Sequence, residues 1–139
     1  MKNEHTAIHK KQNNRFFIAY NILVTEDSSF MRTMLSDIFK SNSSIGEVYE
    51  AGNGIEALEI YNNKKPDLVT MDIDMPEMNG FEAAKNIKSS DYRAKIVIVT
   101  SSHKKEAMQT AKELGIKVYI TKPFDNIKIE KLIENISEL

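Results

Sequence analysis

Residues 66–80, PDLVTMDIDMPEMNG, place two acidic side chains directly after an apolar segment. The segment 68–71 predicts a short buried strand, Asp72 ends it, and Asp74 stands two residues further on. Asn79-Gly80 is typical of a turn. Taken alone, the stretch also fits an ordinary strand followed by a polar loop. A carboxylate at the end of a buried strand nevertheless suits the carboxyl edge of a parallel sheet, where open α/β folds bind their ligands.

Strands and helices are expected to alternate along the rest of the chain. Short apolar segments are separated by segments in which apolar residues recur at helical spacing. The segment 96–100, IVIVT, lacks polar alternation, which indicates a central strand covered on both faces. Alternation of this kind predicts an α/β fold, a (βα)5 doubly wound parallel five-stranded sheet with right-handed crossovers. Strands are expected at 21–25, 48–51, 68–71, 96–100 and 118–121, and helices beginning near 28, 54, 80, 105 and 125.

Apolar stripes on these helices are expected to face the sheet. Gly115 is expected to end the helix that starts at Lys105, and the last helix carries Ile129, Leu132, Ile133 and Ile136 at helical spacing. The other residues expected on inward faces are Phe30, Met31, Met34, Leu35, Ile38, Phe39, Ile55, Leu58, Tyr61, Phe81, Ala84, Ile87, Ala107, Met108, Ala111 and Leu114.

Composition narrows the function classes. With 139 residues the chain is long enough for one domain with a proper core. The net charge of −1 gives no electrostatic reason to expect nucleic acid or a membrane surface as a partner. The absence of cysteine excludes disulfides, thiol catalysis and cysteine-ligated metal sites. The three histidines, His5, His9 and His103, are too scattered to suggest a metal cluster.

Residues 1–20 differ from the remainder, because they are basic and carry little apolar periodicity. We expect a flexible basic N-terminal extension over 1–20 and the domain itself over 21–139. The longest apolar run, residues 16–24, is interrupted by Asn21 and is too short to cross a bilayer. No small-residue cleavage pattern follows it. We therefore expect a soluble cytoplasmic protein with no membrane insertion.

The carboxyl ends of parallel strands lie on one side of the sheet, so the residues that follow them should meet. Four carboxylates at one point repel each other, and such a cluster requires a compensating cation. Oxygen ligands in an open site that keeps waters suit Mg²⁺ better than Ca²⁺. An acid beside Mg²⁺, an ammonium and a hydroxyl is equipped to take up a phosphoryl group. The residues expected to meet are Glu26, Asp27, Asp72, Asp74, Thr100 and Lys122.

Residues 21–139 resemble the receiver domain of bacterial two-component response regulators, of the chemotaxis single-domain type. The resemblance implies a flavodoxin-like sheet with strand order 2-1-3-4-5. It rests on five features in the right order: the acidic pair Glu26-Asp27, AGNGIEAL at 51–58, PDLVTMDIDMP at 66–76, Thr100 after the fourth strand, and Tyr119 with Lys122-Pro123-Phe124 at the fifth.

The resemblance also implies a role for each residue of the acidic site. Asp72 would be the phosphoacceptor, receiving its phosphoryl group from a histidine kinase or a small phosphodonor. Asp27 and Asp72 would ligate Mg²⁺ through their side chains, Asp74 through its backbone carbonyl, and Glu26 through a bound water. Lys122 would pair with the phosphoryl oxygens.

Two further residues would act as a switch. Thr100 would hydrogen-bond the phosphoryl group and move toward it, and Tyr119 would then swing inward. That shift would remodel the face made by the fourth helix, fifth strand and fifth helix, which partners read. The peptide bond before Pro123 is often cis in this family. The chain departs from the usual Asp-Asp pair at Glu26, whose added methylene would shift the water-mediated metal contact. The variable sites Asp74 and Ser102 tend to set the phosphoryl lifetime.

The implied function is a phosphorylation-activated signalling switch, not an enzyme, whose output is binding of a flagellar motor component or a phosphotransfer protein. A phosphorelay intermediate, a receiver fragment of a longer regulator, and a degenerate receiver that only binds partners are alternatives. Asp72-Ile73-Asp74 also resembles the haloacid-dehalogenase phosphatase motif, which belongs on a first strand. Glu26 with a later Asp-x-Asp resembles Toprim enzymes, but that reading leaves Thr100 and Lys122-Pro123 unexplained.

Overall fold

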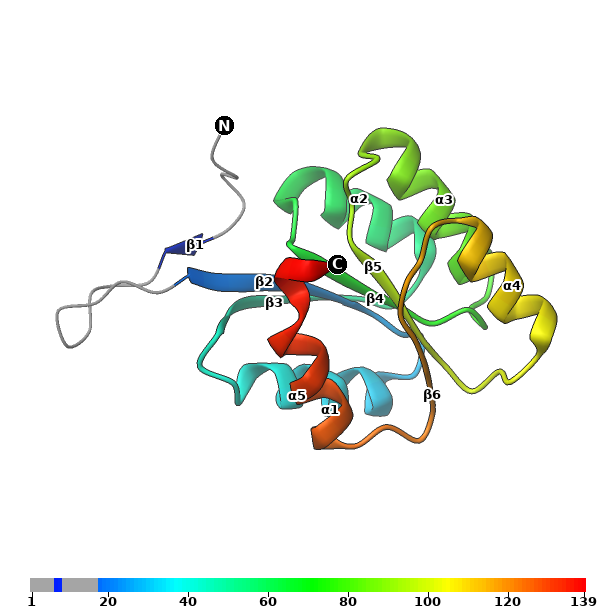
Figure 1. Ribbon diagram of the computed structural model, residues 1–139. Helices are drawn as coiled ribbons and strands as arrows, with labels where there is room; N and C mark the ends of the chain where they lie inside the picture. The colour runs from blue at the N-terminus through cyan, green and yellow to red at the C-terminus, as the bar shows by residue number, and fades with distance from the viewer. Residues whose placement is uncertain (1–6, 9–17) are drawn as a thin grey trace, which may run out of the picture.

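A parallel sheet forms the centre of the computed structural model, which describes residues 7–8 and 18–139. Its strands stand in the spatial order β3-β2-β4-β5-β6 (Figure 1). Counted along the chain, this is the expected order 2-1-3-4-5, so the predicted fold is confirmed. The parallel strands are β2 (Ile18–Thr25), β3 (Ile45–Ala51), β4 (Leu68–Met71), β5 (Ile96–Thr100) and β6 (Tyr119–Thr121).

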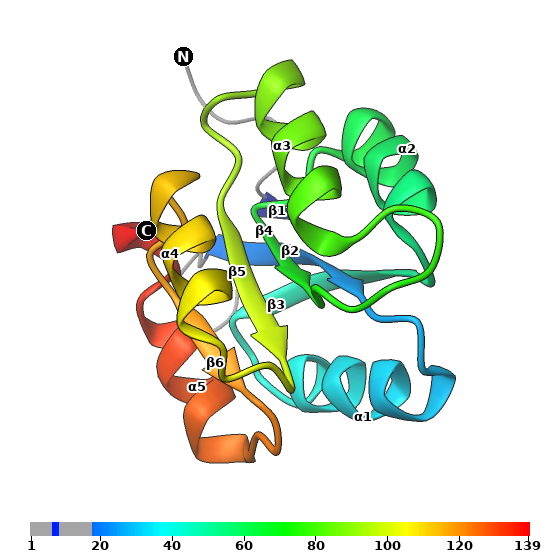
Figure 2. The ribbon, with the colours of Figure 1, turned by 90° about the vertical axis from the view of Figure 1, so that its right-hand side faces the viewer.

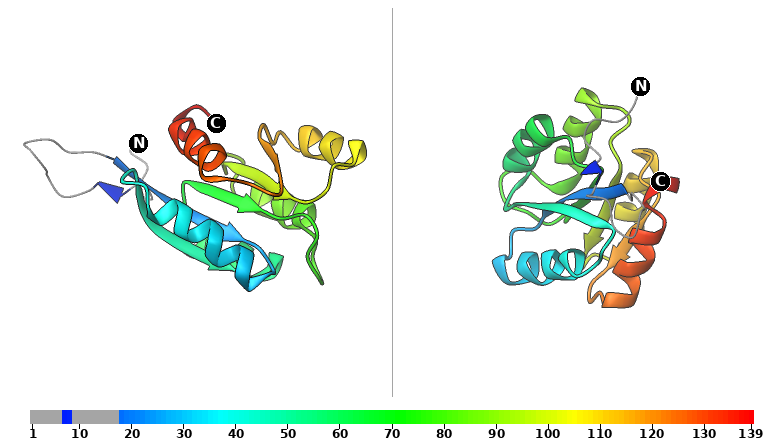
Figure 3. Two further views of the ribbon diagram at one scale, coloured as in Figure 1. Left: turned by 90° about the horizontal axis from the view of Figure 1, so that it is seen from below. Right: turned by 90° about the vertical axis from the view of Figure 1, so that its left-hand side faces the viewer.

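Five helices cover the two faces of the sheet. Helices α1 and α5 lie on one face, and α2, α3 and α4 lie on the other (Figures 1 and 3). Four of the helices begin with a side chain that accepts a hydrogen bond from a backbone N–H two or three residues into the helix, as capping residues do: Ser28, Asn53, Asn79 and Asp125. The helices are α1 (Ser29–Lys40), α2 (Gly54–Lys64), α3 (Gly80–Ser90), α4 (Lys105–Glu113) and α5 (Asn126–Glu134), followed by the 3₁₀ turn η1 (Ile136–Glu138).

The core is divided by the sheet into two apolar clusters. In β2, Ile22 and Val24 pack with α1 and α5, whereas Leu23 between them packs with the helices of the opposite face. Every residue of β4 and β5 is buried, which explains why their sequences show no polar alternation. Burial of side chains on both faces of the strands holds their carboxyl ends in fixed positions.

The expected apolar stripe of α1 is only partly buried. Leu35 and Phe39 are fully enclosed, but Phe30 is 71% exposed and Met34 is 39% exposed. At about 100° per residue, the predicted stripe spans half of the helix circumference, and the sheet covers only the side that carries Leu35 and Phe39. The prediction was likewise wrong for Ile55 in the first turn of α2 and for Met108 in α4, which are 53% and 42% exposed.

Some element boundaries also differ from the expected ones. Strand β2 begins at Ile18 rather than 21, since Ala19 is buried and Tyr20 N donates to Ser44 O at 2.8 Å. The two-residue strand β1 (Ala7–Ile8) pairs antiparallel with the start of β2. The rest of the predicted flexible extension, residues 1–6 and 9–17, lies outside the described residues. Strand β3 begins before the expected 48, and Ile136 lies in η1 rather than in α5.

Two glycines have distinct backbone roles. Gly115 follows α4 with φ of +76°, as expected for a residue that ends a helix. Gly80 follows the turn residue Asn79 and is the first residue of α3, where that helix was expected to begin, and it approaches the backbone after β4. A Cβ atom on Gly80 would lie 2.1 Å from the Asp72 carbonyl oxygen. The chain therefore needs glycine at this position to bring α3 against the residue that ends β4.

None of the helices that the structure describes combines the length and apolarity needed to cross a membrane.

Replacing Gly80 by Ala is expected to lower the free energy of unfolding by about 3 kcal/mol, because the clash involves backbone on both sides and cannot be relieved by a rotamer change. Gly52→Ala is the matched control, since a Cβ there would meet only the Arg32 guanidinium, at 3.4 Å. Urea unfolding followed by circular dichroism measures both variants. Equal stability of the two variants would contradict the close approach.

Candidate functional site

Three acids that follow neighbouring strands meet at the carboxyl edge of the sheet. Glu26 and Asp27 follow β2, and Asp72 follows β4, which lies beside β2. One carboxylate oxygen of each lies within 4.8 Å of the others. Glu26 and Asp72 are only 3% and 4% exposed, whereas Asp27 faces solvent. Figure 2 looks onto the side of the molecule where β2 and β4 end.

Backbone hydrogen bonds hold these acids in place. Asp72 N donates to Thr25 O at 3.1 Å, and Glu26 N donates to Ala51 O at 3.0 Å, so both acids continue the strand pairing. The Arg32 guanidinium of α1 donates to the Glu26 carbonyl oxygen at 2.6 Å. The positions of both buried carboxylates are therefore set by the sheet and by α1 rather than by a free loop.

Lys122 supplies the positive charge of the site. Its ammonium lies against the Glu26 carboxylate and donates to Asp72 Oδ2 at 3.1 Å. Lys122 N donates to Thr100 O at 2.7 Å, which extends the pairing of β6 with β5. The peptide bond between Lys122 and Pro123 is cis, as the resemblance implied. Lys122 thus reaches across the end of β5 to both buried acids.

The length of Glu26 has a visible consequence. Its Oε1 meets the Lys122 ammonium while its Oε2 accepts from Ser28 N at 3.1 Å. The longer side chain therefore bridges the lysine and the N-cap of α1. The departure from an Asp-Asp pair leaves the carboxylate inside the site.

Burial and charge shift the ionisation of this pair. Burial raises the pKa of Glu26, an effect that the hydrogen bond from Lys122 reduces but does not cancel. Burial alone would lower the pKa of Lys122, but the hydrogen bond to Glu26 and the charges of Asp72 and Glu26 raise it. Lys122 therefore stays protonated, and the site disfavours the charge of Glu26 unless a further cation is present.

The donor set fits a magnesium ion. Three carboxylates and one ammonium carry a formal charge of −2, which a divalent cation would balance. Carboxylate oxygens clustered at a partly open edge are the ligands that Mg²⁺ accepts in proteins. The Asp74 carboxylate is exposed and does not belong to this cluster, while Asp74 N donates to Asp72 Oδ1 at 3.3 Å.

Thr100 and Tyr119 occupy the neighbouring strands. The Thr100 side chain is fully buried, and its hydroxyl has no hydrogen-bond partner within the described part of the chain. Tyr119 is half-buried, and its hydroxyl donates to Ser102 O at 2.9 Å. Burial raises the pKa of Tyr119, and the negative charges of Asp74 and Asp72 add to the shift. The tyrosine is therefore tied to the loop that begins directly after Thr100.

Glu26, Asp27, Asp72 and Lys122 meet at one edge, as the direction of the strands led us to expect. The prediction was wrong for the Asp74 carboxylate, which is exposed because Asp74 lies two residues beyond the end of β4.

Sequence reasoning also missed two supporting residues. Arg32 was not predicted to contact the site, because nothing in an amphipathic helix distinguishes an arginine that clamps a neighbouring carbonyl from one in solvent. Gly80 was expected at the turn that starts a helix, but its close approach to the Asp72 carbonyl could not be predicted from the sequence.

Replacing Lys122 by Met is expected to lower the free energy of unfolding at pH 8 by about 3 kcal/mol, because two buried carboxylates lose their counter-charge. The loss should shrink at pH 5. The pKa of Glu26 is higher in the folded state than in the unfolded state, so the folded state gains stability as the pH falls through the folded pKa. This gain is larger in the variant, which lacks the ammonium that stabilises the charged carboxylate.

Urea unfolding in EDTA at both pH values measures this difference. Lys117→Met is the control, because Lys117 is an exposed lysine outside the site. A loss that is the same at pH 5 and pH 8 would show that Lys122 stabilises the fold through packing rather than charge.

Comparison with known proteins agrees with this geometry. The sequence model of the response regulator receiver domain family matches residues 22–134. The chain is 40% identical over 116 residues to the chemotaxis protein CheY of Bacillus subtilis, covering 84% of this chain and 96% of that protein. It is 33% identical to the sporulation initiation phosphotransferase F of the same organism, covering 81% and 90% of the two chains.

Solved structures show the same architecture. CheY in a CheX-CheY-BeF3-Mg complex from Borrelia burgdorferi superposes with a TM-score of 0.79 at 30% identity, covering 86% of this chain and 90% of that one. The response regulator domain of Thermotoga maritima CheB gives 0.76 at 34% identity, covering 86% and 95%. With its fold, its acidic edge and these relatives in agreement, the chain belongs to the response regulator receiver domain family of two-component systems.

Proposed function

We propose that Asp72 accepts a phosphoryl group from the phosphohistidine of a histidine kinase, or from a small phosphodonor, and that the chain signals through the change that follows. The observation that carries this proposal is the setting of Asp72. Its buried carboxylate contacts a fixed ammonium and is clustered with two further acids. The neighbouring strand β5 ends at Thr100, whose buried hydroxyl has no partner among the described residues.

The transfer needs an acceptor oxygen and donors for the transferred group. A carboxylate oxygen of Asp72 would attack phosphorus, the P–N bond of the phosphohistidine would break, and the imidazole would leave with the bonding electron pair. Lys122 would donate to one phosphoryl oxygen and Thr100 to another, which stabilises the charge on the transferring group. The unpaired hydroxyl of Thr100 would thereby gain an acceptor, which favours its movement toward the phosphoryl group.

The acids of the site would hold the metal. Asp27 and Asp72 would contribute carboxylate oxygens, Glu26 would act through a water, and Asp74 would contribute its backbone carbonyl. When bound, Mg²⁺ would supply positive charge that neutralises the acidic cluster and the phosphoryl oxygens.

The signal would pass through the loop after β5. Tyr119 OH holds Ser102 O at 2.9 Å, so a shift of Thr100 that moves residues 101–102 must also move or break this contact. Tyr119 lies in β6, between α4 and α5 in sequence, so its movement would change the surface made by α4, β6 and α5. A downstream protein would bind this surface.

The relatives suggest the pathway. Receiver domains are signalling proteins rather than classical enzymes, and the relatives at about 40% identity are chemotaxis proteins. We therefore propose a cytoplasmic chemotaxis-type regulator whose target is a component of the flagellar motor. The similarity to the sporulation phosphotransferase favours one second candidate, a phosphorelay intermediate that passes its phosphoryl group to a phosphotransfer protein. Transfer of label from the phosphorylated chain to a histidine phosphotransfer protein would distinguish the two.

Incubation with acetyl phosphate and Mg²⁺ is expected to add one phosphoryl group, seen as a single adduct in the intact mass. EDTA or the Asp72→Asn substitution should abolish the adduct, because the first removes the metal and the second the nucleophile. Asp74→Asn is the matched control and should keep the adduct, since it preserves the backbone carbonyl and its carboxylate lies outside the cluster. An adduct on the Asp72→Asn protein would contradict the proposed acceptor.

Replacing Tyr119 by Phe is expected to leave phosphorylation of Asp72 intact. The substitution should weaken the effect of phosphorylation on the loop after β5. Phosphorylation of the unmodified protein should alter hydrogen exchange in residues 101–104 and at the start of α4. The variant should show a smaller change, because it lacks a hydrogen bond of about 1 kcal/mol that joins β6 to this loop. Tyr49→Phe, in β3, serves as the control. An unchanged exchange response in Tyr119→Phe would exclude the hydroxyl from the switch.

A further inference from the structure

A cavity of about 380 Å³ lies at the opposite end of the sheet from the acidic site. It is formed by the segment between α3 and β5, the residues after α4, and the end of the described chain. Ile96, the first residue of β5, lines the cavity, whereas Thr100 at the other end of the same strand belongs to the acidic site. At about 3.3 Å per residue, β5 separates the two by roughly 13–16 Å.

Four cationic side chains line this cavity: Lys88, Arg93, Lys95 and Lys117. No acidic side chain is among its lining residues, although the protein as a whole has a net charge of −1. Over residues 7–8 and 18–139, none of the four cations forms an ion pair with a carboxylate. The cavity therefore concentrates positive charge that its own lining side chains do not neutralise, although Asp91 outside the lining attracts the charge of Arg93.

Backbone carbonyls hold two of these ammonium groups in position. Lys95 Nζ donates to Ile136 O at 2.8 Å, and Lys88 Nζ donates to Ala94 O at 3.3 Å. A carbonyl orients an ammonium without cancelling its charge, and each ammonium keeps two further protons for other acceptors. Both lysines are thus already ordered, which lowers the entropy lost when an anion binds.

The nearest acid along the chain is engaged elsewhere. Asp91 accepts a hydrogen bond from the Tyr61 hydroxyl at 2.7 Å and another from Arg93 N at 3.0 Å. Asp91 is not among the residues that line the cavity, although Arg93, from whose backbone N–H it accepts, is one of them. The Asp91 carboxylate therefore does not occupy the position of an anionic ligand.

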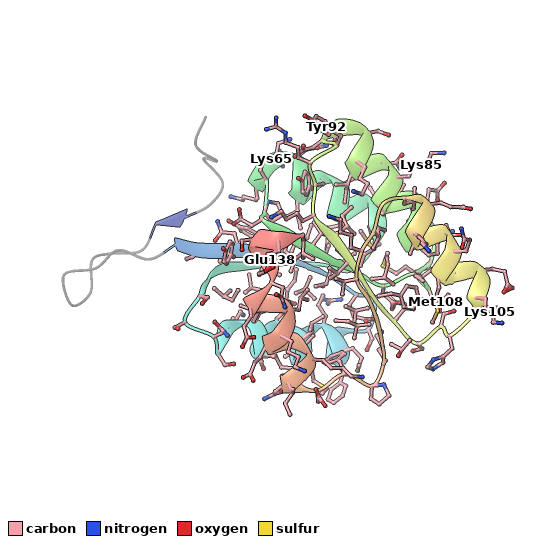
Figure 4. The ribbon with its side chains drawn as sticks, in the orientation of Figure 1. Lys65, Lys85, Tyr92, Lys105, Met108 and Glu138 are labelled. Atoms are coloured by element: carbon pink, nitrogen blue, oxygen red, sulfur yellow. The ribbon has the colours of Figure 1, made fainter. Side chains whose placement is uncertain are left out.

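A flat aromatic ring stands at the rim of the cavity. Tyr92 is 77% exposed, and the Arg93 guanidinium lies 5.5 Å from its ring centroid and donates to its hydroxyl at 3.1 Å. Figure 4 shows Tyr92 at the outer edge of the molecule, far from Lys105 and Met108 at the start of α4. An exposed ring beside a planar cation offers a surface on which another flat ring can stack.

We infer that this cavity binds a phosphorylated small molecule that carries a flat ring, of the class of a nucleoside diphosphate. The lining lysines would bind the phosphates, and Tyr92 with Arg93 would stack on the ring. The cavity volume falls within the range of about 300–1,000 Å³ that small-molecule sites occupy. Its concave shape favours a compact ligand over an extended polyanion. Binding at this cavity does not require phosphorylation of Asp72.

Isothermal titration of the full chain with ADP, at low salt and in EDTA, tests this assignment. We expect one ADP to bind saturably, with a Kd below about 1 mM. Lys95→Met and Arg93→Gln should each weaken it about tenfold, because each removes a charge-assisted hydrogen bond. Lys85→Met is the control, since Lys85 is an exposed lysine on α3 outside the cavity (Figure 4). The Arg93 variant keeps the test decisive if loss of the Lys95 contact impairs folding.

Two further titrations separate the ring from the phosphates and this cavity from the acidic site. Tyr92→Leu should weaken ADP binding several-fold and leave pyrophosphate binding unchanged. If the unmodified protein bound ADP and pyrophosphate with equal affinity, the nucleotide assignment would be overturned. Asp72→Asn should bind ADP as the unmodified protein does. Absence of saturable binding, unchanged binding by both the Lys95 and Arg93 variants, or loss of binding in Asp72→Asn would overturn the proposal.

Discussion

The ion cluster around Lys122 is the interaction on which the arrangement of the carboxyl edge depends. Glu26 and Asp72 are almost fully buried, and a single ammonium contacts both. Burial of two like charges is unfavourable unless they are compensated, so the strands that carry them must hold all three groups in register. The order β2-β4-β5-β6 does this by placing the two acidic strands side by side and letting the long lysine side chain reach across the end of β5.

The same cluster explains why the folded domain would respond to ligands. It retains a formal surplus of negative charge, and burial raises the pKa of Glu26, while the Thr100 hydroxyl lacks a partner among the described residues. Each is an unfavourable feature of the unliganded site that a cation or a phosphoryl group would relieve. Strain of this kind supplies a difference in free energy between two states, which any switch requires. The Tyr119–Ser102 contact offers a route by which that difference could reach β6.

Sequence reasoning recovered the features that depend on periodicity and on the direction of the strands. Asp72 and Lys122 lie 50 residues apart, yet both follow apolar strands, so a parallel sheet must bring them to one edge. Features that depend on tertiary distance were not accessible in this way. The exposure of Phe30, the close approach of Gly80 to Asp72 and the cavity at the amino edge each arise from how far one element lies from another, and hydrophobic pattern does not encode that separation.

The two ends of the sheet share elements, and this limits how their ligands could influence each other. Gly115 and Lys117, which line the cavity, lie between α4 and Tyr119, so the segment that would carry the phosphorylation signal also forms a wall of the cavity. A ligand that binds both conformations of this segment equally would shift nothing, however tightly it bound. If the ligand favours one conformation, thermodynamic linkage makes the effect reciprocal. The ligand then changes the equilibrium of phosphorylation by some factor, and phosphorylation changes the affinity for the ligand by the same factor. Lys117 is the lining residue nearest in sequence to Tyr119, so such a coupling would act through β6 rather than through the distant Lys88.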